Sequence, residues 1–282
     1  RKSKRATCAI GRSPAPLVPT DIGRKRGRLT VVGVGPGADG WRTPAVTQAL
    51  LSAEEVVGYK LYLDLVDHLI VEKPCHQSAL SEEDKRVRIA LDIAATGKNV
   101  ALVCSGDPGI YALASLVFEL LDRENRGDWN LVEICVEPGI SAVQAAASRI
   151  GAPIGHDFCT ISLSNLLTPW EEIARRLRVA ADGDFVIALY NPVSKRRRFQ
   201  MEKAQRIVMN YRSGETPVVL ARNIGREGET INIINLSDLT PDHADMLTLV
   251  IIGNSQTRKT MRGEKGWLYT PRGYENKLKA TK

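Results

Sequence analysis

Short apolar runs recur along the first half of the chain, and each run ends in glycine, proline or polar residues. They cover residues 29–34, 54–59, 100–104 and 131–136. Continuous apolar runs of this length are typical of strands that are buried on both faces of a sheet. We therefore expect four strands here, each followed by a turn at its carboxyl end.

Apolar residues recur at helical spacing between these runs. Thr43 suits an N-cap and Pro44 suits the first position of a helix. Further helices are expected over 81–97, 113–121 and 141–151. Because strands that alternate with helices favour parallel pairing, the pattern predicts an α/β domain.

The same alternation restarts beyond residues 151–157, a segment with Pro153 and Gly155 that we interpret as a linker. Strands are expected over 158–163, 184–190, 216–221 and 246–252, with helices after a capping box at 168–171 and over 199–214. The sequence thus predicts two consecutive α/β domains, each a largely parallel or mixed sheet flanked by helices, with the active-site cleft between them. The predicted bounds are a disordered basic tail over 1–27, domains over 28–152 and 156–275, and a second tail over 276–282.

Charge changes this picture only at the amino-terminal end. The formal net charge is +7, but residues 1–28 hold nine Lys and Arg against one acidic residue, Asp21. The other 254 residues carry 30 basic and 31 acidic side chains. A basic arm could bind nucleic acid, although a solvated leader explains it as well, so a nucleic-acid-binding protein stays open as an alternative.

Composition limits the chemistry further. The five cysteines form no CxxC pair and the four histidines show no metal-ligand spacing, so we expect reduced thiols in a cytoplasmic protein and no bound metal. No apolar run reaches the roughly 18 to 20 residues that cross a bilayer, and no signal peptide is recognisable, so no membrane partner is expected.

The turn at 105–109, Ser-Gly-Asp-Pro-Gly, follows the apolar run at 100–104. Ligands of open α/β sheets bind beyond the carboxyl ends of strands, and glycine lets the backbone approach them. We expect the turns after Val34, Val103, Val136, Tyr190 and Ala221 to meet around one ligand.

A dinucleotide-binding loop is the alternative for the first of these turns, because Gly33, Gly35 and Ala38 loosely match its pattern. However, Pro36 lacks an N–H group and the helix begins only at Thr43–Pro44, so no helix terminus would face a pyrophosphate. A nicotinamide enzyme is therefore disfavoured.

Four consecutive basic residues, Lys195, Arg196, Arg197 and Arg198, fall at the start of a predicted helix, where the helix dipole favours anions. We interpret them, with Arg222, as a binding site for a substrate that carries several carboxylates. A solvated turn or a subunit contact is the alternative. No motif for a catalytic nucleophile occurs, so the catalytic residues are not assigned.

Six short motifs occur in order along the chain. They are Val32–Gly37, Gly58–Tyr62, Ser105–Tyr111, Glu137–Ala142, Leu189–Pro192 and Thr270–Tyr274. Together they resemble the tetrapyrrole methyltransferases of cobalamin biosynthesis, and the similarity extends from about Leu29 to Tyr274. The Tyr-Asn-Pro with its basic run and the final Thr-Pro-Arg-Gly-Tyr look most like the precorrin-3B C(17)-methyltransferase subgroup.

The resemblance implies S-adenosylmethionine as methyl donor, S-adenosylhomocysteine as product, an anionic tetrapyrrole substrate and a homodimer. It also implies methyl transfer to a ring carbon of a precorrin-3 or cobalt-precorrin-3 tetrapyrrole with ring contraction, in which Asp107, Tyr111 and Glu137 stay open as proton carriers. Whether the substrate contains cobalt stays open, and so does a related enzyme that methylates another precorrin position, RNA or protein. Carried over by position, the cofactor-binding residues are Pro36, Ser105, Gly106, Asp107, Ile110, Ser141, Ala142, Asn191 and Asn223.

Overall fold

The computed structural model describes residues 25–194 and 197–274. The chain divides into two compact units, with residues 1–35 and 39–140 in unit 1 and residues 36–38 and 141–282 in unit 2. Both units are α/β structures, as the sequence predicted. Of the predicted tails over 1–27 and 276–282, residues 1–24 and 276–282 lie outside the described residues, as does residue 275. Residues 25–27 are ordered against unit 1 instead of forming part of a disordered tail, since Gly27 O accepts a hydrogen bond from Glu133 N at 2.9 Å.

Unit 1 contains one sheet of five parallel strands in the order β3-β2-β4-β1-β5. Its central strands pair in register, with Val31 opposite Leu102. The strands are β1 (Arg28–Gly33), β2 (Glu55–Tyr59), β3 (Cys75–Ser78), β4 (Asn99–Cys104) and β5 (Glu133–Glu137).

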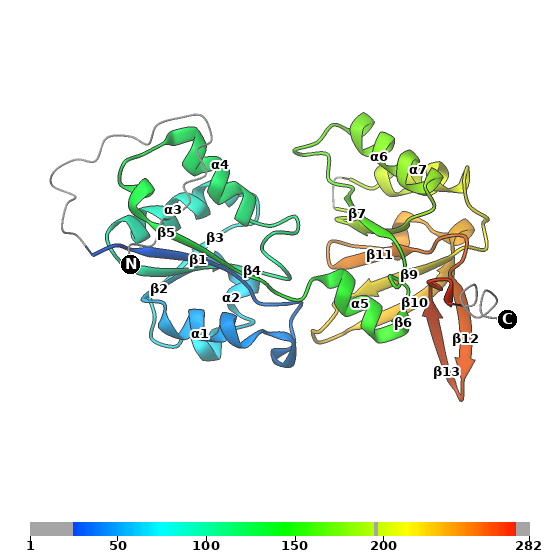
Figure 1. The fold of residues 1–282 in the computed structure, drawn as a ribbon, viewed down its shortest axis with the longest axis horizontal. Coiled ribbons are helices and arrows are strands. Elements are labelled where there is room, and N and C mark those ends of the chain that lie inside the picture. Colours follow the sequence, from blue (N-terminus) through cyan, green and yellow to red (C-terminus); the bar gives the residue numbers. More distant parts are fainter. Residues whose placement is uncertain (1–24, 195–196, 275–282) are drawn as a thin grey trace. The chain divides into compact units, whose positions relative to one another are not determined.

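Helices cover both faces of this sheet (Figure 1). Alternate residues of β4 explain why, since Val100 and Leu102 pack under one pair of helices, whereas Ala101 and Val103 pack under the other. The first pair is α3 (Glu83–Ala95) and α4 (Ala114–Glu124), and the second is α1 (Pro44–Ser52) and α2 (Lys60–Leu63). The predicted cap of α1 is confirmed, because Thr43 Oγ1 accepts a hydrogen bond from Val46 N at 3.3 Å.

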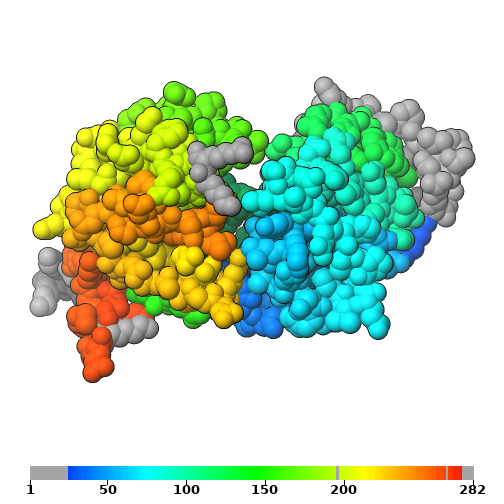
Figure 2. All heavy atoms as spheres, turned by 180° about the vertical axis from the view of Figure 1, so that it is seen from behind, coloured from blue at the N-terminus to red at the C-terminus, as the bar shows by residue number. Residues whose placement is uncertain are grey.

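Unit 2 contains a mixed sheet in the order β10-β9-β11-β8-β7, in which only β7 and β8 are parallel neighbours. A small sheet, β12-β13-β6, adds a hairpin that projects from the body of the unit (Figure 1 and Figure 2). The strands are β6 (Gly151–Ala152), β7 (Phe158–Ser162), β8 (Val186–Tyr190), β9 (Pro217–Arg222), β10 (Thr230–Asn235), β11 (Thr248–Ile252), β12 (Arg258–Arg262) and β13 (Lys265–Tyr269). Its helices are α5 (Ala142–Ile150), α6 (Trp170–Asp182) and α7 (Phe199–Met209).

The predicted linker over 151–157 is wrong, because the chain divides ten residues earlier, between Ile140 and Ser141. Helix α5 contacts β6, β11 and β13 and therefore belongs to unit 2. The buried face of α5 includes Val143, Ala146 and Ile150, an apolar face that either unit could have covered. Segment 151–157 contains the short strand β6 instead of a linker.

The local structure differs from the predictions in three further respects. The capping box at 168–171 does not form, since Pro169 is the N-cap of α6 and no side chain caps it. Strands β3, β10, β12 and β13 were not predicted, because they lie at sheet edges or in a hairpin and lack a continuous apolar run. Helix α7 ends at Met209, before the expected stop at Gly214.

Candidate functional site

The carboxyl edge of the unit 1 sheet has the topology of a ligand site. Strands β1 and β4 are neighbours, but the chain leaves β1 through α1 and leaves β4 through α4, on opposite faces of the sheet. Such a reversal of direction opens a crevice beyond the strand ends, where α/β proteins bind small ligands. The turns after β1 and β4 are therefore the centre of the candidate site in this unit.

Three glycines let the turns after β1, β4 and β5 pack backbone to backbone. A Cβ atom on Gly33 would lie 2.5 Å from Gly106 O. One on Gly139 would lie 2.1 Å from Gly106 O and 2.3 Å from Gly33 O. Gly35 and Gly106 also exchange backbone hydrogen bonds of 3.2 and 2.8 Å. No side chain larger than hydrogen fits at Gly139, so the backbone itself lines this edge.

Asp107 joins two of these turns. Its Oδ1 accepts a hydrogen bond from Gly109 N at 2.8 Å, and its Oδ2 accepts one from Gly139 N at 3.1 Å. Ser105, Gly106 and Ile110 belong to the same turn, so all four cofactor-binding residues predicted in unit 1 lie at this edge. The three turns of unit 1 thus meet, as expected.

The other predicted cofactor residues lie in unit 2, at the edge where β7, β8 and β9 end. Tyr190, the last residue of β8, places its hydroxyl 2.5 Å from Ser141 Oγ and accepts a hydrogen bond from Val143 N at 3.2 Å. This hydroxyl fixes the first turn of α5, with Ser141 and Ala142, to the end of β8. The neighbouring residue Asn191 has a positive φ of 50° and donates from Nδ2 to Ser162 Oγ at 3.0 Å.

Pro36 and Asn223 also come together in unit 2. Asn223 follows β9 with a φ of 51°, and its carbonyl accepts a hydrogen bond from Arg226 N at 2.9 Å. Arg226 Nε donates to Pro36 O at 2.7 Å. The sequence offered no signal for this contact, because the two partners are 190 residues apart. In the sheet, the ends of β8 and β9 are separated only by β11, which places the Asn191 and Asn223 turns about 10 Å apart.

Arg197 and Arg222, two residues of the predicted substrate-binding set, lie in different environments. Arg197 is 8% exposed, and its Nη1 donates to Asn191 O at 2.7 Å and to Leu163 O at 2.9 Å. Burial lowers the pKa of this guanidinium. The predicted substrate ligand Arg197 thus holds the Asn191 turn. Arg222 is half exposed and pairs with Asp245 at 2.6 Å, while Lys195 and Arg196 lie outside the described residues.

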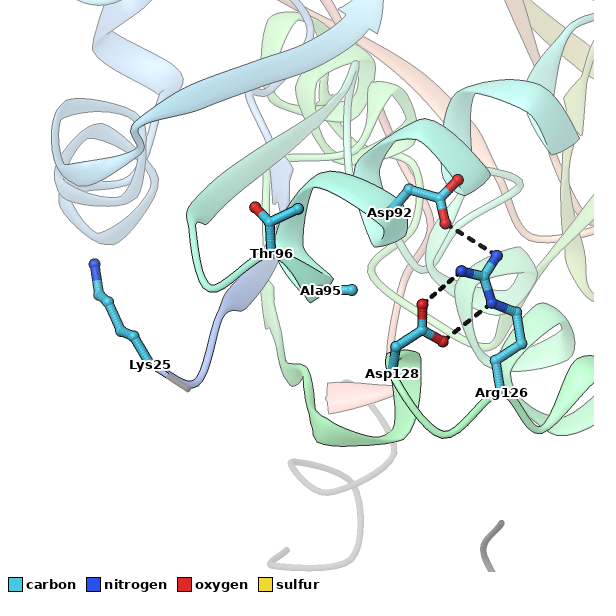
Figure 3. A pocket seen from close by; sticks show the side chains of 6 residues that line it. All are labelled: Lys25, Asp92, Ala95, Thr96, Arg126 and Asp128. Atoms are coloured by element: carbon cyan, nitrogen blue, oxygen red, sulfur yellow. Dashed lines mark hydrogen bonds and ion pairs between the residues drawn. The ribbon is translucent and has the colours of Figure 1, made fainter. Parts of the chain in front are cut away.

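A hollow of about 610 Å³ lies elsewhere, at the amino edge of the unit 1 sheet (Figure 3). Arg126 occupies its wall, with Nη2 at 2.6 Å from Asp128 Oδ2, Nη1 at 3.0 Å from Asp92 Oδ1 and its guanidinium 4.1 Å from the ring centre of Trp129. These charged groups form ion pairs with one another, and they lie at the edge of the sheet opposite the glycine turns. We therefore do not assign the candidate site to this hollow. It is lined by Lys25, Asp92, Ala95, Thr96, Arg126 and Asp128.

Burial keeps the thiols of two cysteines, Cys104 and Cys159, protonated. Burial raises the pKa of the Cys104 thiol to about 11 and that of Cys159 to about 11, so neither is a thiolate at neutral pH. Within residues 25–194 and 197–274, no three His, Cys, Asp or Glu side chains gather as metal ligands. No helix in the same part of the chain is long and apolar enough to cross a membrane.

Replacing Tyr190 with Phe tests the junction between β8 and α5. Ser141 is 2% exposed, so loss of the Tyr190 hydroxyl leaves a buried polar group without this partner, which costs about 1 to 3 kcal/mol. We expect urea unfolding to report that loss and calorimetry to report weaker S-adenosylhomocysteine binding. The half-exposed Tyr211→Phe is the matched control, and equal behaviour of the two variants would refute the role given to Tyr190.

The sequence pattern of the tetrapyrrole (corrin/porphyrin) methylases matches residues 28–240. A precorrin-3B C(17)-methyltransferase from Sinorhizobium sp is 44% identical over 249 residues, which cover 88% of this chain and 97% of that protein. A cobalt-factor III methyltransferase from Priestia megaterium is 42% identical over 252 residues, which cover 89% of this chain and 46% of that protein. The chain thus spans about half the length of the second relative.

Two solved structures are similar to this fold. The crystal structure of the methyltransferase CobJ superposes with a TM-score of 0.78 at 41% identity and covers 87% of this chain and 100% of that chain. A uroporphyrin-III C-methyl transferase from Thermus thermophilus, solved with S-adenosyl homocysteine, superposes with a TM-score of 0.61 at 20% identity, over 80% of this chain and 92% of that chain. The second similarity establishes the fold alone.

Proposed function

Because the chain belongs to the tetrapyrrole (corrin/porphyrin) methylase family, we propose that it is a C-methyltransferase that uses S-adenosylmethionine. Its substrate is a precorrin-3B or cobalt-factor III tetrapyrrole, which it methylates at C(17) with ring contraction during cobalamin biosynthesis. The observation that carries this proposal is the 44% identity to a precorrin-3B C(17)-methyltransferase across 97% of that relative.

The glycine turns of unit 1 fit a ligand that the backbone holds. No Cβ atom could be placed on Gly33 or Gly139 without overlapping a neighbouring backbone atom, and Asp107 fixes the turns from the side. Ser105, Gly106, Asp107 and Ile110 would bind the donor here, and we retain Pro36, Ser141, Ala142, Asn191 and Asn223 of unit 2 as proposed donor-binding residues. Arg222 and the basic segment at 195–196 would receive substrate carboxylates.

Positioning is the main contribution that these residues make to the reaction. When bound, S-adenosylmethionine supplies an activated methyl group, so no protein nucleophile is required. Rigid turns that hold donor and acceptor in a reactive geometry can contribute about 7 to 11 kcal/mol. Asp107 and Tyr111 follow β4 at this edge, Glu137 is the last residue of β5, and these three are the candidate proton carriers for ring contraction.

Two measurements test the proposal. Calorimetry with S-adenosylhomocysteine should give saturable binding, and incubation with S-adenosylmethionine labelled in its methyl group should transfer label to precorrin-3B or to cobalt-factor III. Comparing the two acceptors decides whether the substrate contains cobalt. Binding without transfer to either macrocycle would reject the proposed reaction while retaining the donor site.

We further propose that the protein is a cytoplasmic homodimer. Light scattering would test the number of subunits.

A further inference from the structure

Arg86 lies at the carboxyl edge of the unit 1 sheet, on the side of β2 and β3. Only 3% of this residue is exposed, although it carries a charge. Its Nε donates to Ser78 Oγ at 2.7 Å, its Nη2 donates to Ala79 O at 2.7 Å, and its guanidinium lies 6.0 Å from the ring centre of Tyr59. The side chain therefore has a defined position at the ends of two strands.

No carboxylate of the described residues forms an ion pair with this buried cation. Arg88, two residues further along α3, pairs with both Asp84 and Glu124, whereas Arg86 has no ion pair among the described residues. The pKa of Glu82 is lowered mainly by its hydrogen bond from Ala79 N and, to a smaller extent, by the charge of Arg86. Burying a charge without an ion pair is unfavourable, and binding of an anion offsets that cost.

One nitrogen of Arg86 remains available to an anion. The two hydrogen bonds use Nε and Nη2 and leave Nη1 without a partner. Among the described residues, the only fully buried side-chain nitrogen or oxygen atoms without a hydrogen bond are Gln200 Oε1 and Arg212 Nε, so Nη1 of Arg86 keeps contact with solvent. A guanidinium that is held on two sides and open on the third is preorganised to bind an oxyanion.

The strand register places Arg86 within reach of the predicted donor site. Ser78 pairs with Tyr59 across β3 and β2, and Gly58 pairs with Val103 across β2 and β4. Ser78 and the Cys104–Ser105 turn are thus two strand spacings apart, which is about 10 Å. A macrocycle whose reacting carbon lies near that turn can extend a peripheral carboxylate to Arg86.

We propose that Arg86 forms a subsite that binds a peripheral carboxylate of the tetrapyrrole substrate. The subsite rests on the proposed function for the identity of its ligand. Arg86 belongs to unit 1, whereas Arg197 and Arg198 belong to unit 2.

Fluorescence titration with uroporphyrin III, a carboxylated tetrapyrrole, tests this subsite without requiring turnover. Arg86→Gln keeps hydrogen-bonding capacity but removes the charge, so we expect the dissociation constant to rise at least about tenfold, because hydrogen bonds to charged groups are the stronger ones. Arg86→Lys should lie between the wild type and the Gln variant. The matched control is Lys85→Gln, an exposed neighbour on α3, which should bind like the wild type.

Calorimetry with S-adenosylhomocysteine on the same variants separates binding from folding. The inference requires that donor affinity change less than about twofold in Arg86→Gln while macrocycle affinity falls. An unchanged macrocycle affinity, or an equal loss of both affinities, would overturn it. If Arg86→Gln does not fold, the Lys variant decides by the same criteria. Arg86-dependent porphyrin binding in a protein that methylates neither precorrin-3B nor cobalt-factor III would reject the proposed reaction but keep the subsite.

Discussion

Gly139→Ala is expected to abolish measurable binding of S-adenosylhomocysteine and to lower the free energy of unfolding by about 2 to 3 kcal/mol. The new Cβ atom would lie 2.1 Å from Gly106 O and 2.3 Å from Gly33 O. Both are backbone oxygens, which cannot move aside as the end of a flexible side chain can. The turns after β1, β4 and β5 must therefore move apart. Forced overpacking costs about 1 to 3 kcal/mol, and here the displaced atoms line the predicted donor site.

Gly40→Ala is the matched control for this variant. No atom lies within 4 Å of a Cβ atom built at Gly40, which precedes α1 on the surface. Isothermal calorimetry gives the affinity, and urea unfolding gives the stability of both variants. A Gly139→Ala protein with the affinity and stability of Gly40→Ala would show that the close backbone packing is not required.

Arg212→Met is expected to destabilise the protein by about 3 kcal/mol or more while leaving donor affinity unchanged in the remaining folded protein. The Arg212 side chain is 1% exposed, with Nη1 bonded to Gly253 O and Nη2 bonded to Phe185 O at 2.8 Å. Burial lowers the pKa of this guanidinium, but arginine stays charged at neutral pH. Methionine would fill the space and leave these carbonyl groups buried without donors, a loss of the order measured for broken buried polar pairs.

The location of Arg212 explains why stability and affinity should separate. Of its two carbonyl partners, Phe185 lies between α6 and β8, and Gly253 follows β11. Both therefore lie at the opposite edge of the sheet from the end of β8. Arg178→Met on the exposed face of α6 is the control, and thermal unfolding with calorimetry on both variants gives the comparison. An Arg212→Met protein as stable as the control would contradict the anchoring role.

Local chemistry explains the predictions that the structure confirms. Thr43 caps α1 within three residues of itself, and the apolar run at 100–104 becomes a central strand whose two faces are both covered. The predicted turn at 105–109 follows that strand at the carboxyl edge. These features depend on neighbouring residues, so the one-dimensional pattern is enough to locate them.

The failed predictions required information from distant parts of the chain. Helix α5 has an apolar face that identifies it as packed but does not say against which unit, and only its contacts with β6, β11 and β13 assign it to unit 2. In the sequence, Arg197 is one of four consecutive cations that we interpreted as a binding site for substrate carboxylates. In the structure it is buried and donates to the carbonyl groups of Leu163 and Asn191. Burial of a charge depends on tertiary neighbours and not on the residue type.

By itself, the sequence determined the alternation of strands and helices, the glycine turns that end the strands, and the resemblance to the methylase family. Those features follow from local apolar spacing, from residues that allow tight turns, and from motifs that occur in order along the chain. Only the tertiary structure decided that Gly139 contacts Gly33 and Gly106, that Tyr190 holds the start of α5, and that Arg86 is a buried cation with no ion pair among the described residues. Each of these depends on the order and register of strands in a sheet, which brings together residues that are tens of positions apart.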